Sequence, residues 1–237
     1  MESTGYVTLA RQSGLMREME TIAHNMANAA TTGFRQQGLV FSEYVHAVEG
    51  GHSLSMAAAR VKKTSTAQGI LTQTGNTLDL AIEGSGYFQV ETPDGVRLTR
   101  AGAFNVSSEG DIVSSDGHRV LDLGGAPINV PPGELSVQVA ADGTVSAGER
   151  LLGQIGIVEP EKGADLIREA GVLFRTDAPL SPSTDGKILQ GHLEGSNVDA
   201  ISQLTRMIEV QRAYEMGQKL LDMDHERSKA TLETLIK

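Results

Sequence analysis

The spacing of the apolar residues changes twice along this chain, and this change constrains the fold more than any single motif. Near both ends, apolar residues recur every three or four positions, as on one face of an amphipathic helix. From about residue 76 to residue 195 they alternate with polar residues, as in half-buried strands. Because helices and strands are segregated along the chain, the pattern predicts an α+β fold.

The predicted architecture is an antiparallel β-rich central domain with N- and C-terminal amphipathic helices that pair as a coiled-coil-like inner domain. The first helix takes residues 1–35 and the second takes residues 196–237. Residues 36–75 lack clear periodicity and are expected to form a linker or extended arm. Residues 76–195 are expected to form the outer β domain.

The N-terminal helix carries a seam, a row of apolar residues separated by seven, three or four positions. Its members are Leu9, Met16, Met19, Ala23, Met26 and Ala30, and the row is widened by Leu15 and Ile22. After the seam, the stretch "NMANAATTGF" ends the helix with small and amide-bearing residues.

Two interpretations of this helix end are open. Asn25 and Asn28 are expected to satisfy backbone groups that become free where the helix stops. Gly33 then supplies the turn, and Phe34 anchors the chain as it leaves the helix. Alternatively, Asn and Gly simply terminate an ordinary helix.

The C-terminal helix is expected to begin after Ser196 or Asn197, either of which is a suitable N-cap. Its seam consists of Met207, Val210, Tyr214, Leu221 and Leu235, and it is flanked by Ile201, Leu204 and Ile208. Gly217 interrupts this helix, where a glycine costs about 1 kcal/mol relative to alanine. A glycine also permits a close helix approach, and propensity alone does not decide between the two.

In the middle of the chain, "YFQVE", "VRLTR" and "LSVQV" alternate as strands do, and Asp-Gly or Glu-Gly pairs separate them as tight turns. Further strands are expected at "GQIGIVE", "GVLF" and "KILQGHL". A short helix is expected near Asp165–Glu169, and residues 178–184 are expected to be irregular.

Charge and composition exclude several classes of function. The net charge is −10, which argues against a protein that tracks nucleic-acid phosphates. Residues 1–35 carry three basic and three acidic side chains, and residues 197–237 carry six and seven, so most of the excess lies in the middle. Cysteine is absent, which excludes disulfides, thiolate metal sites and Cys nucleophiles.

No catalytic, cofactor or metal motif stands out. The six His residues are scattered, and no G-x-S-x-G elbow, phosphate loop or dinucleotide fingerprint is complete. Two carboxylates that are far apart in the sequence can lie close together in the fold, and sequence spacing does not reveal such a pair. An enzyme therefore stays a minor alternative. The helices themselves leave two options open: a permanent stalk within one chain, or surfaces that are buried against other subunits.

Four stretches resemble bacterial flagellar axial proteins of the rod and hook group. "IAHNMANAATTGFRQQ" (22–37) is similar to their N-terminal signature, although His24 stands where members often carry Asn. Residues 78–121, "VAADGTV" (139–145) and residues 193–221 are similar to their central and C-terminal segments, in the same order. The length and the opening residues are most similar to the proximal-rod subunits, and the distal-rod subunits are the nearest rival.

The resemblance implies a structural subunit of the basal-body rod, with no enzymatic activity, cofactor, metal or small-molecule substrate. Its partners would be other copies of itself, neighbouring rod proteins and the flagellar type III export apparatus. It would reside in the periplasmic rod, and the polar opening "MESTGYVTLARQSG" fits export without a cleaved signal. The alternative from another class is a monomeric secreted β-domain binding module with a helical stalk.

Assembly contacts are expected along both helices and at their junction with the middle of the chain. The expected contact residues are Leu9, Met16, Met19, Ile22, Asn25, Met26, Asn28, Gly33, Phe34, Asn197, Val198, Ile201, Leu204, Ile208, Gln211, Tyr214 and Leu221.

Overall fold

A computed structural model describes residues 2–46, 54–131, 137–161 and 163–235. The chain divides into two compact units. The first, called here the helical unit, comprises Met1–Ala29, Gln36–Ser65 and Val198–Lys237. The second, called here the β unit, comprises Ala30–Arg35 and Thr66–Asn197. Within the described residues, no helix is long and apolar enough to span a membrane.

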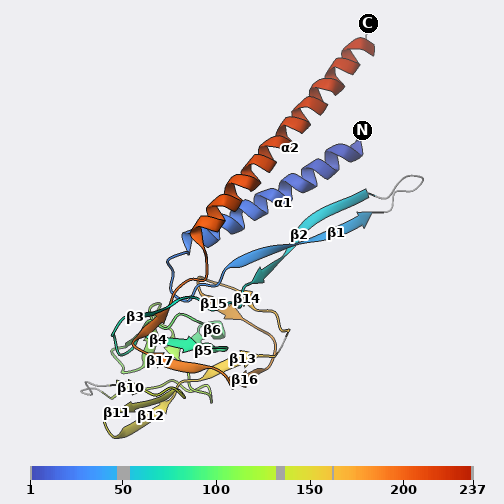
Figure 1. Ribbon diagram of the computed structural model, residues 1–237. Coiled ribbons are helices and arrows are strands. Elements are labelled where there is room, and N and C mark those ends of the chain that lie inside the picture. Colours follow the sequence, from blue (N-terminus) through green and yellow to red (C-terminus); the bar gives the residue numbers. More distant parts are fainter. Residues whose placement is uncertain (1, 47–53, 132–136, 162, 236–237) are drawn as a thin grey trace. The chain divides into compact units, whose positions relative to one another are not determined.

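The helical unit is built on two antiparallel helices that lie side by side, with the chain termini at the same end (Figure 1). Helix α1 spans Glu2–Ala27 and helix α2 spans Ala200–Leu235. An ion pair joins them, with 2.7 Å between Arg206 Nη2 and Glu18 Oε1. The predicted α+β class and the two terminal helices are therefore present.

Helix α2 begins later than the sequence suggested. Asp199 is its N-cap, because its carboxylate accepts hydrogen bonds from the backbone N–H groups of Ile201 and Ser202. The Ser202 hydroxyl and these N–H groups lower the pKa of Asp199. The predicted caps were wrong: Asn197 instead donates its side-chain N–H to the Ala67 carbonyl at 2.7 Å, within the β unit.

A long β-hairpin occupies most of the segment that was expected to be a linker or extended arm. Strand β1 (Gln37–His46) pairs antiparallel with β2 (Leu54–Thr64), and the register shifts between Val40 and Phe41. Both strands contact α1. An isolated two-stranded ribbon is marginally stable in water, so packing against a helix is its natural support.

The β unit contains antiparallel sheets only, as the alternating pattern predicted, among the residues that the structure describes. Its strands are β3 (Leu71–Gln73), β4 (Leu80–Glu83), β5 (Tyr87–Thr92), β6 (Gly95–Thr99), β7 (Phe104–Val106), β8 (Ile112–Ser114), β9 (Arg119–Val120), β10 (Val137–Val139), β11 (Thr144–Ala147), β12 (Arg150–Gln154), β13 (Ile157–Pro160), β14 (Ile167–Arg168), β15 (Leu173–Arg175), β16 (Leu180–Pro182), β17 (Lys187–Gln190) and β18 (His192–Glu194).

The largest sheet follows the order β14-β15-β6-β5-β9-β8-β7, with β13 and β16 joined to it through β5. Three smaller sheets pair β10-β11-β12, β17-β4 and β18-β3. The last two pairs bring the C-terminal end of the unit back onto its first strands. The β unit is therefore closed by residues that are far apart in the sequence.

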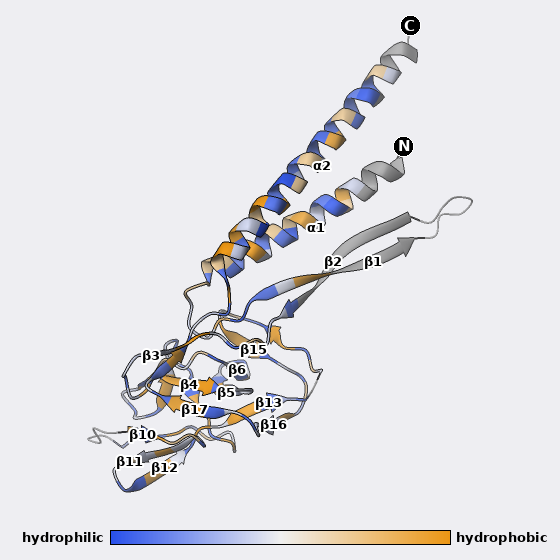
Figure 2. Ribbon diagram, in the orientation of Figure 1, coloured by the Kyte–Doolittle hydropathy of each residue, from blue (hydrophilic) through white to orange (hydrophobic). Residues whose placement is uncertain are grey.

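A cluster of buried apolar residues forms the core of the β unit, and Figure 2 shows hydrophobic residues in orange along several of its strands. Phe88 and Phe104 lie at its centre with their rings 5.2 Å apart, edge to face. Aliphatic side chains from most of the strands surround them, including Leu80, Ile112 and Val145, all fully buried. This core explains how a chain with 4% aromatic residues and no Trp still builds a stable β unit.

Two local predictions in this unit were wrong. Strand β14, not a helix, lies near Asp165–Glu169, and Ile167 pairs with Arg175 of β15. Strand β16 lies within the stretch expected to be irregular, where Pro182 pairs with Val158. In both places pairing with another strand outweighs the local sequence preference.

Candidate assembly site

The α1–α2 contact is the core of the helical unit, and it is partly polar. Val210 and Ile22 are buried apolar residues of the two helices. The buried side chain of Gln12 donates a hydrogen bond to the Tyr214 carbonyl at 2.9 Å. A Cβ added to Gly217 would lie 2.4 Å from Gln12 Nε2. Of the two roles left open for Gly217, the close approach of α1 is therefore the one that the structure shows.

The predicted N-terminal seam is divided by this packing. Ile22 is buried and Met19 and Met26 are half-buried, whereas Leu9 and Met16 are largely exposed. The physical reason is that the polar residue Gln12 occupies an inner position through its hydrogen bond, and hydrophobic spacing does not reveal such a position. In α2 the prediction fits better, because Met207, Tyr214 and Leu221 are half-buried on the inner row.

Asn25 shows why α1 ends in amide-bearing residues. Its side-chain N–H donates to the Gln37 carbonyl at 2.8 Å, and its Oδ1 accepts from the Gln37 backbone N–H at 2.9 Å. This is the two-bond pairing that a neighbouring strand would offer. The same amide also donates to Gln203 Oε1 of α2 at 3.1 Å. One buried side chain thereby joins α1, the start of β1 and the first turns of α2.

Asn28 has a more ordinary role at the same helix end. Its side chain donates to the His24 carbonyl at 2.8 Å, one of the carbonyl groups that a helix terminus leaves without an intrahelical partner. The backbone N–H of Asn28 bonds the Asn25 carbonyl at 3.1 Å, which tightens the last turn. Asn28 thus satisfies a backbone group that the helix end leaves free, as the first interpretation of the motif describes, whereas Asn25 bonds the chain beyond the helix end.

Gly33 and Phe34 belong to the β unit. Gly33 has φ of +69°, and a Cβ there would lie 2.2 Å from the Ala101 nitrogen, so only glycine fits. Its N–H donates to the Glu194 carbonyl at 2.7 Å. The Phe34 ring is fully buried, and the Arg168 guanidinium lies 4.2 Å from its centroid and 4.6 Å from that of Phe174.

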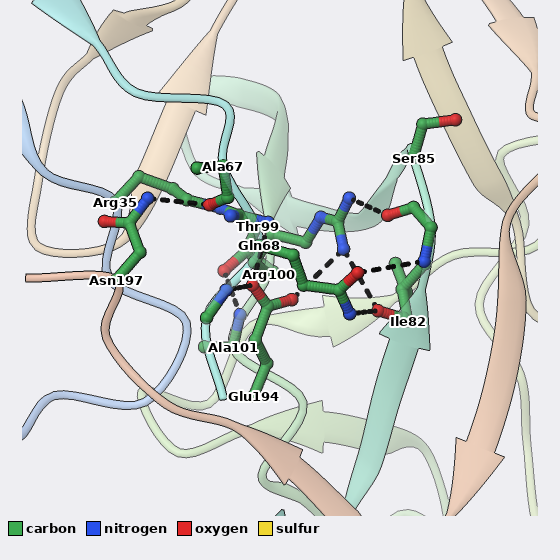
Figure 3. A network of polar contacts seen from close by, with 12 residues as sticks. Arg35, Ala67, Gln68, Ile82, Ser85, Thr99, Arg100, Ala101, Glu194 and Asn197 are labelled. Carbon is green, nitrogen blue, oxygen red and sulfur yellow. Dashed lines mark hydrogen bonds and ion pairs between the residues drawn. The ribbon is translucent and has the colours of Figure 1, made fainter. Parts of the chain in front are cut away.

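Beside Phe34 lies a buried ionic cluster that the sequence analysis did not single out (Figure 3). Glu194 Oε1 lies 2.8 Å from Arg35 Nη2, and Glu194 Oε2 lies 3.1 Å from Arg100 Nη1. All three side chains are at most 4% exposed. Arg100 also donates to the carbonyls of Ile82 and Gly84, at 3.2 Å and 2.7 Å.

Burial shapes the electrostatics of this cluster. Desolvation lowers the pKa of Arg100, and the nearby Glu194 carboxylate opposes that shift. Desolvation likewise lowers the pKa of Arg168 to about 10. Burial raises the pKa of Tyr87, although the neighbouring arginines act in the opposite direction. Burial and charge pairing thus act together on Arg100, and the cluster of Arg35, Arg100 and Glu194 is called here the lock.

A signal for the lock was present in the sequence. Arg35 and Glu194 fall inside the two terminal stretches that carry the family resemblance, but residue spacing does not reveal an ion pair between residues 159 positions apart.

The remaining expected assembly residues differ in their exposure. Ile201, Leu204, Ile208 and Gln211 are exposed on α2, whereas Asn197 and Val198 are half-buried.

The described residues offer little for catalysis. They contain no group of three or more His, Cys, Asp or Glu side chains that could hold a metal ion. A hollow of about 500 Å³ in the β unit has Asp142, Ser183 and Lys187 among its lining residues, and no His lines it. Ser183 donates its hydroxyl hydrogen to Glu159, an arrangement without the nucleophile–base–orienter geometry of a hydrolase.

Comparison with known proteins agrees with this structural character. Residues 81–147 match the flagellar hook protein FlgE/F/G D1 domain, and residues 189–234 match the flagellar basal body rod FlgEFG protein C-terminal domain. The chain is 38% identical to the flagellar basal-body rod protein FlgF of Mesorhizobium japonicum over 99% of its length and 98% of the relative.

Two further relatives are similar over nearly the same length. FlgF of Caulobacter vibrioides is 37% identical over 99% of this chain and 98% of the relative. FlgG of Bacillus subtilis is 31% identical over 93% of this chain and 94% of the relative. The chain therefore belongs to the flagellar basal-body rod protein family, and it is a structural subunit and not an enzyme.

Proposed function

We propose that this protein is a proximal-rod subunit that polymerises through the outer surfaces of α1 and α2 into the periplasm-spanning drive shaft. The observation that carries the proposal is the large apolar surface that the helical unit leaves exposed. Leu9 and Met16 on α1, and Ile201 and Leu204 on α2, are each about half exposed or more. Apolar stripes of this kind on helices indicate a protein interface.

The proposal includes the finer organisation predicted from the sequence. The helices of residues 1–35 and 196–237 pair in a coiled-coil-like manner as the axial core, residues 36–75 act as an arm, and residues 76–195 form the outer domain. The ion pair between Glu18 and Arg206 and the contact of Gln12 with Gly217 support the helix pairing. Export through the flagellar type III apparatus, without signal cleavage, completes the proposal.

The identity of the relatives favours the proximal over the distal position. Two FlgF relatives match at 37–38% over nearly the whole chain, a third FlgF relative matches at 33%, and FlgG relatives match at 30–34% over a smaller share of it. Labelling the protein and locating it in isolated basal bodies tests this point directly. A label at the cell-proximal end of the rod supports the proposal, and a label at the hook-proximal end supports the distal-rod alternative.

The assembly role is tested by placing charges on the exposed apolar surface. The Leu204→Asp/Ile208→Asp double variant should fold like the wild type, because both side chains are exposed in the single chain. It should nevertheless be absent from isolated basal bodies. Thr205→Asp is the control, since it introduces one of the two negative charges at an exposed polar position of the same helix turn.

Normal incorporation of the double variant, with normal motility, would contradict the assembly role of this surface. A wild-type protein that is absent from basal bodies, and whose helices are fully protected as a monomer at every concentration, would support the binding-module alternative. In that case the contacts between α1 and α2 would serve a permanent stalk.

A further inference from the structure

Three arginines of the β unit gather around Tyr87, beside the lock. Burial raises the pKa of Tyr87, and the positive charges of Arg35, Arg100 and Arg168 act against this rise. The Arg100 guanidinium lies 5.3 Å from the centroid of the Tyr87 ring. Arg168 Nη2 donates a hydrogen bond to the Arg35 carbonyl. The three guanidinium groups therefore share one neighbourhood, although they come from distant parts of the sequence.

This neighbourhood carries more positive than negative charge. Glu194 forms ion pairs with Arg35 and Arg100, at 2.8 Å and 3.1 Å (Figure 3). Among the ion pairs of the described residues, Arg168 has no carboxylate partner, and its guanidinium instead lies over two phenylalanine rings. Three positive charges against one negative charge leave a surplus of two, in a region where removing charge from water is costly.

The same arginines hold most of the buried polar atoms that lack a partner. Within the part of the chain that the structure describes, five buried side-chain N or O atoms have no hydrogen-bond partner. Four of them are Arg35 Nε, Arg35 Nη1, Arg100 Nε and Arg168 Nε. Each is an N–H donor, because a guanidinium has no acceptor. A bound ion is one of the ordinary explanations for such a group of buried donors.

The chemistry of these atoms indicates what could bind there. A water molecule accepts from N–H donors but leaves the surplus charge unchanged. An anion accepts from the same donors and also compensates the positive charge. Because Arg35 is 1% exposed, the ligand must be small enough to lie inside the β unit. This requirement excludes a carboxylate side chain of another protein.

We propose that the β unit binds one small inorganic anion of the size of chloride at the Nε–H and Nη1–H groups of Arg35, in the positive field of Arg100 and Arg168. Glu194 occupies Nη2 of the same guanidinium, so the carboxylate and the anion bind different nitrogens. The anion stabilises the β unit because it binds the folded unit and not the unfolded chain. This site is independent of the assembly surface of the helices.

Hydrogen exchange on the full-length chain tests the site. The amides of β4 and β5 are followed while chloride replaces gluconate, a larger anion, at constant ionic strength and pH, so that charge screening stays the same. Binding slows exchange through unfolding by a factor of 1 + [Cl⁻]/Kd, which is about elevenfold at ten times Kd. The response should therefore saturate. Equal exchange in the two salts, or a response that rises without saturation, would overturn the proposal.

Arg35→Lys is the decisive variant, because it keeps the positive charge beside Glu194 and removes the guanidinium donors. It should lose the saturable response to chloride. Arg119→Lys is the matched control, since Arg119 belongs to the same unit, is 46% exposed and pairs with Glu91. The control should respond like the wild type. An equal response of both variants would place the ion elsewhere and overturn the proposed site.

A second variant decides the question if Arg35→Lys does not fold. Arg168→Gln removes one of the three positive charges and leaves both ion pairs of Glu194 in place. It should raise the chloride concentration at half-saturation by about threefold or more. This concentration is measured separately from the stability of the variant without chloride. An unchanged half-saturation concentration would contradict the proposal, and none of these outcomes bears on the rod function.

Discussion

The two units of this protein are stabilised in different ways. The β unit surrounds Phe88 and Phe104 with fully buried aliphatic side chains and locks the segment 30–35 through the Arg35–Glu194 pair. Among its described side chains, the helical unit has fewer buried apolar residues, and polar contacts such as Asn25 to Gln37 contribute to holding it together. Large apolar side chains are exposed in both units, but the buried apolar clusters of the described residues lie in the β unit.

This difference predicts that the two units differ in stability before assembly. A single apolar stripe makes a helix marginal in water, so the helical unit should open far more often than the β unit. Hydrogen exchange on the purified chain measures this directly, segment by segment. Strong protection of β4 and β5 together with weak protection of α1 and α2 would establish the contrast, and equal protection would remove it.

The largest expected effect is on the lock of the β unit. Glu194→Gln leaves Arg35 and Arg100 buried without their shared carboxylate, which should lower the free energy of unfolding of the β unit by about 3–5 kcal/mol. Urea unfolding followed by exchange of the β-unit amides measures the loss.

The control for the lock is Glu169→Gln, because Glu169 pairs with Arg97 and Arg175 at a half-exposed position. That change should lower the free energy of unfolding by less than about 1 kcal/mol. Equal effects of the two substitutions would show that burial of the Glu194 pairs contributes nothing special.

A smaller effect is expected at the join of the helical unit. Asn25→Ala removes three hydrogen bonds and leaves the Gln37 backbone groups without that partner, so the free energy of unfolding of the helical unit should fall by about 1–3 kcal/mol. Faster exchange in α1, β1 and α2, with unchanged exchange in β5, is the expected signature.

Asn28→Ala is the comparison for Asn25, because it removes a single exposed cap bond. Its effect should be about 1 kcal/mol or less. If Asn28→Ala weakened the helical unit as strongly as Asn25→Ala, the joining role of Asn25 would be wrong, and both residues would simply be helix terminators.

Features of both units that depend on local sequence patterns were predicted, and features that depend on long-range polar contacts were not. Strands β5 and β6 were predicted because alternation and an Asp-Gly turn act locally, whereas the contact of Phe88 with Phe104 was not predicted. The apolar flank of α2 formed by Ile201, Leu204 and Ile208 was found from its spacing. The Arg35–Glu194 pair and the Gln12 contact were not found, because each joins residues that are far apart through polar groups. Hydrophobic periodicity carries no information about such contacts.

Next in size is the close approach of the two helices. Alanine is better than glycine inside a helix by about 1 kcal/mol, so Gly217→Ala should stabilise α2 if only propensity mattered. The added methyl group would instead displace Gln12 and break its bond to Tyr214, leaving a buried amide without a partner. We expect a net loss of about 1 kcal/mol from the free energy of unfolding.

A double-mutant cycle with Gln12→Ala separates the two contributions to Gly217→Ala. In the Gln12→Ala background the displaced amide is absent, so Gly217→Ala should become neutral or stabilising. Destabilisation of the same size in both backgrounds would show that another neighbour of Gly217, and not Gln12, requires the glycine.

The smallest expected effect concerns the first turn of α2 and depends on pH. The Ser202 hydroxyl and the backbone N–H groups lower the pKa of Asp199 below its usual value, so the capping contribution is present above that usual value and is lost as the pH falls through the lowered pKa. Asp199→Ala should therefore increase exchange in the first turn of α2 at neutral pH, and the difference from the wild type should vanish in acid. A difference that persists in acid would mean that Asp199 acts through packing and not through its charge. Because the exposed residue Ile201 lies two positions after Asp199, a weakened cap should also reduce incorporation into the rod slightly, since it loosens the turn that presents this apolar side chain.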